Sequence, residues 1–321
     1  MELIVPTVDP RIKAFLDHAF DLSVLLSNPK MIPTLYNSYI SLNYSFGWED
    51  RLDIEKPVYL GRHIWDAKRF QFRNSLSFFD SEDPVEMIVE NNKRMICEGY
   101  CVLGEYDEYH VPGKKTYGKS HYIHNYLISG FNDEEKSFTV HGYSSKNGLE
   151  QYGKVNLEID YYKCAISIDR KPFPDTMQLW RYLEYRKVNI NNVDISLDTA
   201  KIKRSIESFL EPDDNDYGIN VFTIISEFQD QTINLRDIRL LYEHAKLMVK
   251  RAECLTKHRL ISNSSDLIEL LDTVTRFAEA LFYKTVKIKI LNKDYSDIRK
   301  ALLRLAELEQ NAFKLFVYKL K

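Results

Sequence analysis

Two histidines three residues apart mark the segment with the clearest capacity for acid–base chemistry. They are His121 and His124, in the stretch HYIHNYLISG at residues 121–130. Imidazole exchanges protons near neutral pH, and one held at the rim of a sheet can act as general base for a nucleophile on a packed helix. Side chains alternate along a strand, so His124, which opens the predicted strand, shares a face with Tyr126. The alternatives are a polar strand-edge residue for His124 and a surface residue for His121.

Asp107 and Tyr109 lie at the end of a strand predicted over residues 100–109. A carboxylate that accepts a hydrogen bond from the imidazole holds the ring in a productive orientation. We therefore expect Asp107 or Tyr109 to orient His124 or to line the groove beside it. The other interpretation of Asp107 is an aspartate that caps a turn.

The sequence predicts neither a metal site nor a cofactor. Cys97 and Cys101, in CEGYC, lack a second Cys/His pair at finger-like spacing, which favours structural roles for both thiols. His18, His124 and Asp107 are all zinc-type ligands, but no sequence spacing supports a site built from them. The acidic loop at 211–218 lacks the glycine and the terminal glutamate of a calcium-binding EF-hand loop.

Residues 1–190 predict an α+β domain with helices packed on an antiparallel sheet. An apolar stripe over residues 11–27 predicts a core-facing helix. Residues 83–97 predict a second helix, with Asp83 as its N-cap and Pro84 at the first helical position.

The strand signals of this domain lie mainly after residue 100. The segments HNYLISGF and SFTVHGY flank the polar turn FNDEEK and predict a β-hairpin. Further strands are predicted within residues 155–168 and 177–185. Such a mixture of strands and helices is typical of a two-layer α+β architecture.

Residues 191–321 predict an all-helical domain. Ser196 is the expected cap of a helix over residues 196–211. Three longer amphipathic patterns follow, over residues 233–260, 264–290 and 295–320. Because their connections are short and polar, we expect these three helices to pack as an antiparallel bundle.

Length and composition indicate an ordinary globular protein of about two domains. A chain of 321 residues is too long for a single small domain. Its composition, with 44% hydrophobic and 28% charged residues, argues against disorder. The 21 Tyr and 17 Phe predict ring-rich cores with some buried, hydrogen-bonded hydroxyls. A net charge of -3 lacks the strongly basic character of a nucleic-acid-binding domain, so no nucleic-acid partner is expected.

The sequence favours a cytoplasmic protein. Its first residues, MELIVPTVDP, lack the basic and apolar regions of a secretory signal. No run of about 18 uncharged apolar residues indicates a membrane span. Four cysteines are too few for a disulfide scaffold.

The run from Ile96 to Tyr152 resembles papain-like proteins related to the N-terminal region of the butirosin biosynthesis protein H, many of them encoded in natural-product gene clusters. The resembling blocks are a strand ending in Asp-Glu-Tyr, a Pro-Gly loop, the His-x-x-His strand, the Gly-Phe-Asn-Asp turn and the Gly-Tyr that closes the hairpin. The helical domain resembles the C-terminal part of some relatives. The resemblance implies a papain-like fold for residues 1–190. It also implies acyl transfer from a carrier-protein thioester to an amine, with a cysteine as nucleophile and His124 as base.

The sequence departs from this family at the nucleophile. A papain-like cysteine lies at the N-terminal end of the first core helix, where the helix dipole and the imidazole lower the thiol pKa. No cysteine precedes Cys97, and where relatives read Asn-Cys-aromatic this chain has Asp-His-Ala-Phe, with His18 at the cysteine position. The weak substitutes are Ser23, Ser27, Cys97 and Cys101. The position of the family's orienting residue falls near His141 or Gly142, and neither is a carboxylate.

We therefore expect a papain-like protein of natural-product biosynthesis, of the nonribosomal peptide type, that binds or transfers an acyl or peptidyl group. If active, it would be an acyltransferase or a cysteine-peptidase-like hydrolase, with the catalytic candidates His124, Asp107, Tyr109 and His18. The alternative is a pseudoenzyme that binds or scaffolds a synthetase. The expected partner is an acyl or peptidyl carrier protein or its tethered substrate. An excess of basic residues from Lys284 onward suits such an acidic partner, and a solvated basic face explains it equally well.

Overall fold

The fold was analysed in a computed structural model of residues 1–321. It describes residues 1–46, 50–56, 64–73, 83–146, 149–166, 180–189, 195–227, 234–262, 264–291 and 293–321. The chain divides into two compact units. The first comprises Met1–Pro10, Phe20–Asn28 and Gly61–Val193, and the second comprises Arg11–Ala19, Pro29–Leu60 and Asp194–Lys321.

The predicted boundary between residues 190 and 191 lies outside the described residues. Two earlier segments, Arg11–Ala19 and Pro29–Leu60, cluster with the C-terminal helices. Specific hydrogen bonds hold them there. The backbone N–H groups of Lys13 and Ala14 donate to Glu243 at 2.6 and 2.9 Å, and Leu52 donates to Asp237 at 3.2 Å. Such long-range contacts leave no periodic signal in the sequence.

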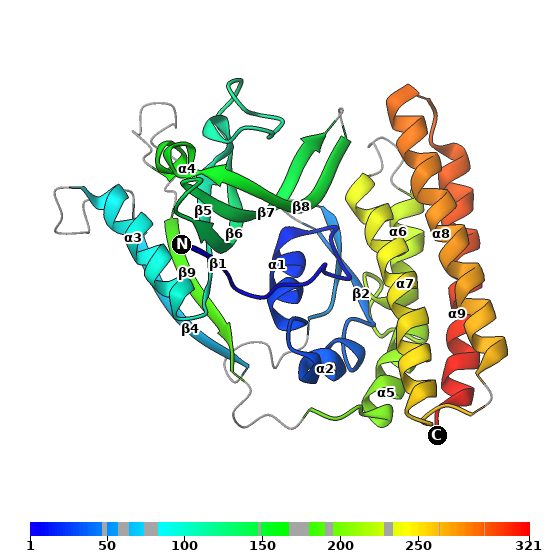
Figure 1. The fold of residues 1–321 in the computed structure, drawn as a ribbon. Coiled ribbons are helices and arrows are strands. Elements are labelled where there is room, and N and C mark those ends of the chain that lie inside the picture. The colour runs from blue at the N-terminus through cyan, green and yellow to red at the C-terminus, as the bar shows by residue number, and fades with distance from the viewer. Residues whose placement is uncertain are drawn as a thin grey trace. The chain divides into compact units, whose positions relative to one another are not determined.

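A seven-stranded sheet forms the centre of the first unit (Figure 1). Its order is β4-β9-β5-β6-β7-β8, β1 also pairs with β6, and every pairing is antiparallel. The bounds are β1 Glu2–Ile4, β4 Trp65–Arg73, β5 Cys101–Asp107, β6 Ile123–Asn132, β7 Ser137–Lys146, β8 Leu149–Glu158 and β9 Trp180–Val188. The predicted α+β class, with an antiparallel sheet and C-terminal helices, is confirmed.

The β6–β7 hairpin is confirmed and has a local cause. The Asn132 side chain accepts the backbone N–H groups of Glu134 and Glu135 at 2.9 and 3.1 Å, which closes the turn. β6 begins at Ile123, one residue before the predicted start, and His124 is its second residue.

Helices α3, Pro84–Cys97, and α4, Ile159–Ile166, accompany this sheet. The Asp83 side chain accepts the Glu86 N–H at 2.9 Å, which confirms the predicted cap of α3. The predicted strand over 155–168 is wrong after residue 158. There Ile159, Tyr162, Ala165 and Ile166 bury one helical stripe, and this spacing of three and four outweighs the strand preference of the β-branched and aromatic residues. Residues 167 and 168 lie outside the described residues.

Tyrosine hydroxyls are hydrogen-bonded inside the first unit, as predicted. Tyr126 and Tyr162 share a hydrogen bond of 2.7 Å, and Asn92 donates to the Tyr162 hydroxyl at 2.9 Å. The Tyr185 hydroxyl donates to Asn92 at 3.0 Å. This buried network joins α3 and α4 to β6 and β9, so it fixes the layer on which the β5–β6 pair rests.

The second unit is mainly helical. Its long helices α7 Leu235–Lys257, α8 Ser265–Leu291 and α9 Ser296–Lys319 agree with the three predicted amphipathic segments, and α8 packs against both α7 and α9. The unit also contains α2 Ile32–Tyr36, the strands β2 Leu42–Ser45 and β3 Arg51–Ile54, α5 Thr199–Leu210 and α6 Val221–Glu227. Within the described residues, none of the helices has the length and apolarity that a membrane crossing requires.

Two helix starts differ from the predictions. Helix α1, Leu16–Leu25, begins later than the apolar stripe from residue 11. Helix α5 is capped by Asp198, whose side chain accepts the Lys201 N–H at 2.8 Å, and not by Ser196. The Ser196 carbonyl instead accepts a hydrogen bond from the Asn37 side chain, which places Ser196 in the preceding loop.

Candidate acid–base site

Two consecutive carboxylates at the end of β5 each bind a histidine that lies at or before the start of β6. Asp107 is the last residue of β5 and Glu108 the first of a short 3-10 turn. The antiparallel register places Tyr106 opposite His124 and Asp107 opposite Ile123. The strand pairing therefore brings the Asp-Glu sequence and the His-x-x-His sequence together.

The carboxylate bound to His124 is Glu108. Oε1 of Glu108 lies 2.8 Å from Nδ1 of His124, and Thr116 donates to Oε2 at 3.2 Å. Lys114 Nζ lies 3.1 Å from Oε1, with both side chains of this ion pair buried. Burial alone would raise the pKa of Glu108, but the hydrogen bond to His124 and the Lys114 charge outweigh it and lower this pKa. An ionised Glu108 can only accept a hydrogen bond, so Nδ1–H of His124 donates it and Nε2 is the ring nitrogen left for a substrate.

The His124 side chain is about a quarter exposed, at 23%. Glu108 is 9% exposed, so the imidazole is accessible from solvent while its partner is shielded. Within the part of the chain that the structure describes, Glu108 is the hydrogen-bond partner of His124, and the Tyr122 ring packs 5.2 Å from the imidazole. A hydrogen-bonded imidazole and carboxylate are two of the three members of a catalytic triad.

Asp107 binds His121, which corrects its expected pairing with His124. Oδ2 of Asp107 lies 2.5 Å from Nδ1 of His121, and Oδ1 accepts the backbone N–H groups of Tyr109 and Tyr122, each at 3.0 Å. Burial would raise the pKa of Asp107, but these hydrogen bonds outweigh it and lower this pKa. Asp107 thus caps the turn, as the alternative interpretation held, and also orients a histidine.

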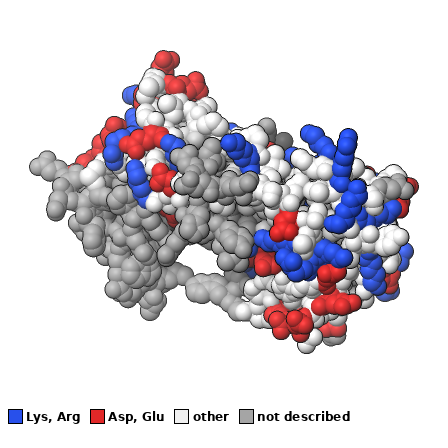
Figure 2. Space-filling view, turned by 90° about the horizontal axis from the view of Figure 1, so that it is seen from below, with Lys and Arg blue, Asp and Glu red and all other residues white. Residues whose placement is uncertain are grey.

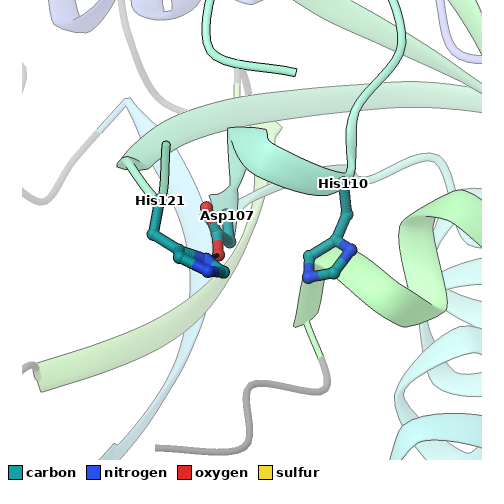
Figure 3. A group of neighbouring side chains, drawn as sticks. All are labelled: Asp107, His110 and His121. Atoms are coloured by element: carbon teal, nitrogen blue, oxygen red, sulfur yellow. Dashed lines mark hydrogen bonds and ion pairs between the residues drawn. The ribbon is translucent and has the colours of Figure 1, made fainter. Parts of the chain in front are cut away.

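Tyr109 packs against His121 and not against His124. The two rings are stacked with centroids 4.4 Å apart, and the His110 ring meets Tyr109 edge-on at 5.0 Å. Figure 3 shows the Asp107 side chain between the imidazoles of His110 and His121. Asp107, His110 and His121 each present a ligand atom, and these atoms lie within 4.8 Å of one another, so they form a candidate metal-binding cluster. The sequence analysis had not considered His110.

His18 lies in the second unit. Its side chain is completely buried, Nε2 lies 2.6 Å from Oδ1 of Asp53, and the Tyr39 ring meets the imidazole edge-on at 5.9 Å. Burial would raise the pKa of Asp53, but the hydrogen bond and the charge of His18 outweigh it and lower this pKa to about 2. The surroundings of His18 are those of a packed structural histidine, and they do not support its expected catalytic role.

The four substitute nucleophiles have other environments. Ser23 is buried with its hydroxyl 3.1 Å from that of Tyr152, and Ser27 donates to the Val24 carbonyl at 2.7 Å. Cys101 is buried within β5, which raises the pKa of its thiol to about 12. Cys97 is exposed at the C-terminal end of α3, opposite to the helix end where a papain-like cysteine lies. None of these environments activates a nucleophile.

His141 does not orient His124 either. It pairs in register with Leu127, and its Nε2 is hydrogen-bonded to the Ser129 hydroxyl at 2.8 Å. Burial is the main reason that the pKa of His141 falls to about 4, so the ring is neutral near pH 7. Its role in β7 is that of a satisfied core histidine.

Sequence reasoning missed Glu108 and Lys114. Glu108 stands next to Asp107, and only the strand register decides which carboxylate meets which histidine. A search for carboxylates at both residues of the strand end would have found it. Lys114 gave no signal, because a lysine in a loop is usually solvated and this one is buried against Glu108.

Comparison with family models and curated proteins gives no assignment for this geometry. The chain matches none of the protein-family models searched, and none of the curated proteins is significantly similar to it. The papain-like resemblance therefore stays a prediction, and the residues of the site carry the functional argument.

Proposed function

We propose that the first unit is a papain-like protein that binds an acyl or peptidyl group and uses His124, oriented by Glu108, as a general base in its transfer. The observation that carries this proposal is the 2.8 Å contact between His124 Nδ1 and Glu108 Oε1 at a partly exposed strand end. In a catalytic dyad a buried carboxylate orients the imidazole, and the accessible imidazole transfers the proton.

The acceptor takes the place of the missing cysteine in this mechanism. His124 Nε2 removes the proton of an amine or water as the acceptor attacks the acyl carbonyl. The tetrahedral intermediate then expels the thiolate of the donor thioester, which takes up the proton held by His124 and leaves as the thiol. The environments of Ser23, Ser27, Cys97 and Cys101 support this direct route, because none favours an acyl-enzyme.

The proposed donor is an acyl or peptidyl carrier protein within nonribosomal peptide-type biosynthesis. Lys and Arg exceed Asp and Glu from Lys284 onward, in α8 and α9. On the face drawn in Figure 2, Lys and Arg side chains gather over the helical part of the molecule, with acidic side chains among them. Positive charge favours an acidic carrier by steering its approach.

The second candidate is a pseudoenzyme that binds the loaded carrier or a synthetase without chemistry. The missing cysteine before Cys97 favours it. Loss of a triad nucleophile normally leaves only the rate that binding and oxyanion stabilisation provide.

The two candidates are separated by incubating the protein with an acyl-loaded carrier protein and an amine mixture. Intact-protein mass spectrometry follows thioester loss, and equilibrium binding to the loaded carrier is measured in parallel. The transferase predicts thioester loss that His124→Ala and Glu108→Gln abolish while His258→Ala, at an exposed helix end, retains it. Binding without thioester loss supports the pseudoenzyme. If the protein neither binds the loaded carrier nor consumes its thioester, both candidate functions are contradicted for that carrier.

A further inference from the structure

We propose that Asp107, His110 and His121 form a binding site for a divalent transition-metal ion of the zinc class. Two imidazoles and one carboxylate are a ligand set that zinc uses where it keeps a coordination position open. The three residues come from the end of β5, from the adjoining 3-10 turn and from the segment before β6. The proposal is independent of acyl transfer, because His124 and Glu108 are not members of this cluster.

The separations suit a metal ion. The three ligand atoms lie within 4.8 Å of one another, and Oδ2 of Asp107 lies 2.5 Å from Nδ1 of His121. Bonds of about 2.0–2.1 Å at tetrahedral angles place neighbouring zinc ligands roughly 3.3 Å apart. The 2.5 Å separation is shorter than that value and 4.8 Å is the upper limit for the other pairs, so side-chain rotations would have to bring the three atoms to coordination distance. The ion would replace the His121–Asp107 hydrogen bond by two metal bonds.

The surroundings hold the carboxylate and both rings in place. Oδ1 of Asp107 is fixed by the N–H groups of Tyr109 and Tyr122, which leaves Oδ2 as the oxygen directed to the cluster. The Tyr109 ring stacks on His121 and meets His110 edge-on. Outer contacts that orient ligands in this way normally accompany functional metal sites.

The ion would be accessible from solvent. Asp107 is 1% exposed, whereas the His121 side chain is 34% exposed, so the site has a buried and an open side. Three protein ligands leave a fourth position for water or for an anionic group of a ligand. Imidazole ligands favour zinc, cobalt, nickel or copper over magnesium and calcium, which prefer all-oxygen sites.

The test is a titration of the full chain, freed of metal with a chelator, with Zn²⁺ and Co²⁺ alone. Zn²⁺ affinity is measured by competition with a chromophoric chelator, and Co²⁺ coordination by its visible absorption. We expect one ion per chain and a loss of affinity of more than about 10-fold in both His110→Ala and His121→Ala, since loss of an outer-shell contact alone costs about 10–100-fold. His124→Ala and His258→Ala are the matched controls, and both should bind as the unaltered chain does.

Two results would overturn the proposal. One is the absence of stoichiometric binding, which leaves the Asp107–His121 pair as a structural hydrogen bond. The other is equal weakening in His258→Ala, which indicates binding by scattered surface histidines. Circular dichroism of each variant establishes that it is folded. Among the described residues the His110 side chain has ring contacts with Tyr109 and His121 and no hydrogen bond, so His110→Ala is the variant least expected to unfold.

Discussion

Nδ1 of His124 lies 2.8 Å from Oε1 of Glu108, and the buried ammonium group of Lys114 lies 3.1 Å from the same oxygen. Glu108 therefore hydrogen-bonds the partly exposed His124 and forms an ion pair with the buried Lys114. The orientation of the base and the stability of the loop that holds Lys114 depend on one carboxylate.

Glu108→Gln should destabilise the chain, because it leaves the Lys114 charge buried without its counter-charge. Breaking one partner of a buried ion pair costs about 3–5 kcal/mol. The free energy of unfolding, measured with urea, should fall by about that amount. Glu108→Gln combined with Lys114→Met should recover much of the loss, since the double variant removes both charges of this pair. Equal losses in the single and the double variant would contradict this coupling.

Asp237→Asn should stabilise the second unit above pH 7. Burial raises the pKa of Asp237 from 3.8 to about 7, so the folded state holds a proton that the unfolded state releases. The stability that this group confers is present below pH 3.8 and is lost as pH rises through about 7. Ionisation then costs up to about 4 kcal/mol, which the neutral Asn avoids while it still accepts the Leu52 N–H.

Unfolding free energies of wild type and Asp237→Asn, measured from pH 4.5 to 8.5, test this sign. The difference should grow in favour of Asn up to about pH 7 and level off above it. A constant difference, or one that shrinks as pH rises, would show that Asp237 is not held protonated.

Arg251→Lys should destabilise the chain by about 3 kcal/mol or more. The completely buried guanidinium group donates to the carbonyls of Tyr36, Ser38 and Tyr39 at 2.8, 2.6 and 3.2 Å. An ammonium group cannot reproduce this planar fork, and an unsatisfied buried carbonyl costs about 1–3 kcal/mol. Thermal unfolding measures the effect, with Lys250→Ala as the surface control. If Arg251→Lys melted at the same temperature as Lys250→Ala, the Arg251 hydrogen bonds would not stabilise the chain as stated.

Ser23→Ala should leave any acyl-transfer activity unchanged. The Ser23 hydroxyl is buried against that of Tyr152, so its removal costs roughly 1 kcal/mol of stability and no chemistry. Product formation per folded protein is the readout. A loss comparable to that of His124→Ala would identify Ser23 as the nucleophile and would replace the direct mechanism.

Local features of the fold could be predicted from the sequence. The Asp83 cap, the turn after Asn132 and the strand that contains His124 follow from short-range hydrogen bonding and alternation. Helix α4 was mistaken for a strand, since three of its four buried residues (Ile159, Tyr162 and Ile166) are β-branched or aromatic and only tertiary packing decides their period.

The site was predicted in part. His124 and Asp107 were named, but their partners depend on the register of β5 and β6, which sequence spacing leaves open. Asp107 consequently meets His121, and Glu108 meets His124. His110 was missed because a histidine in a turn becomes a candidate ligand only when His121 is brought to the same place.

The most direct test of the central claim is thiol release from a small acyl thioester, such as an acyl N-acetylcysteamine, with an added amine at neutral pH. This substrate needs no carrier protein, so the measurement isolates the chemistry of His124. We expect release above the uncatalysed rate for wild type and at that rate for a folded His124→Ala variant. Equal release by the two proteins would contradict the assignment of His124 as the base.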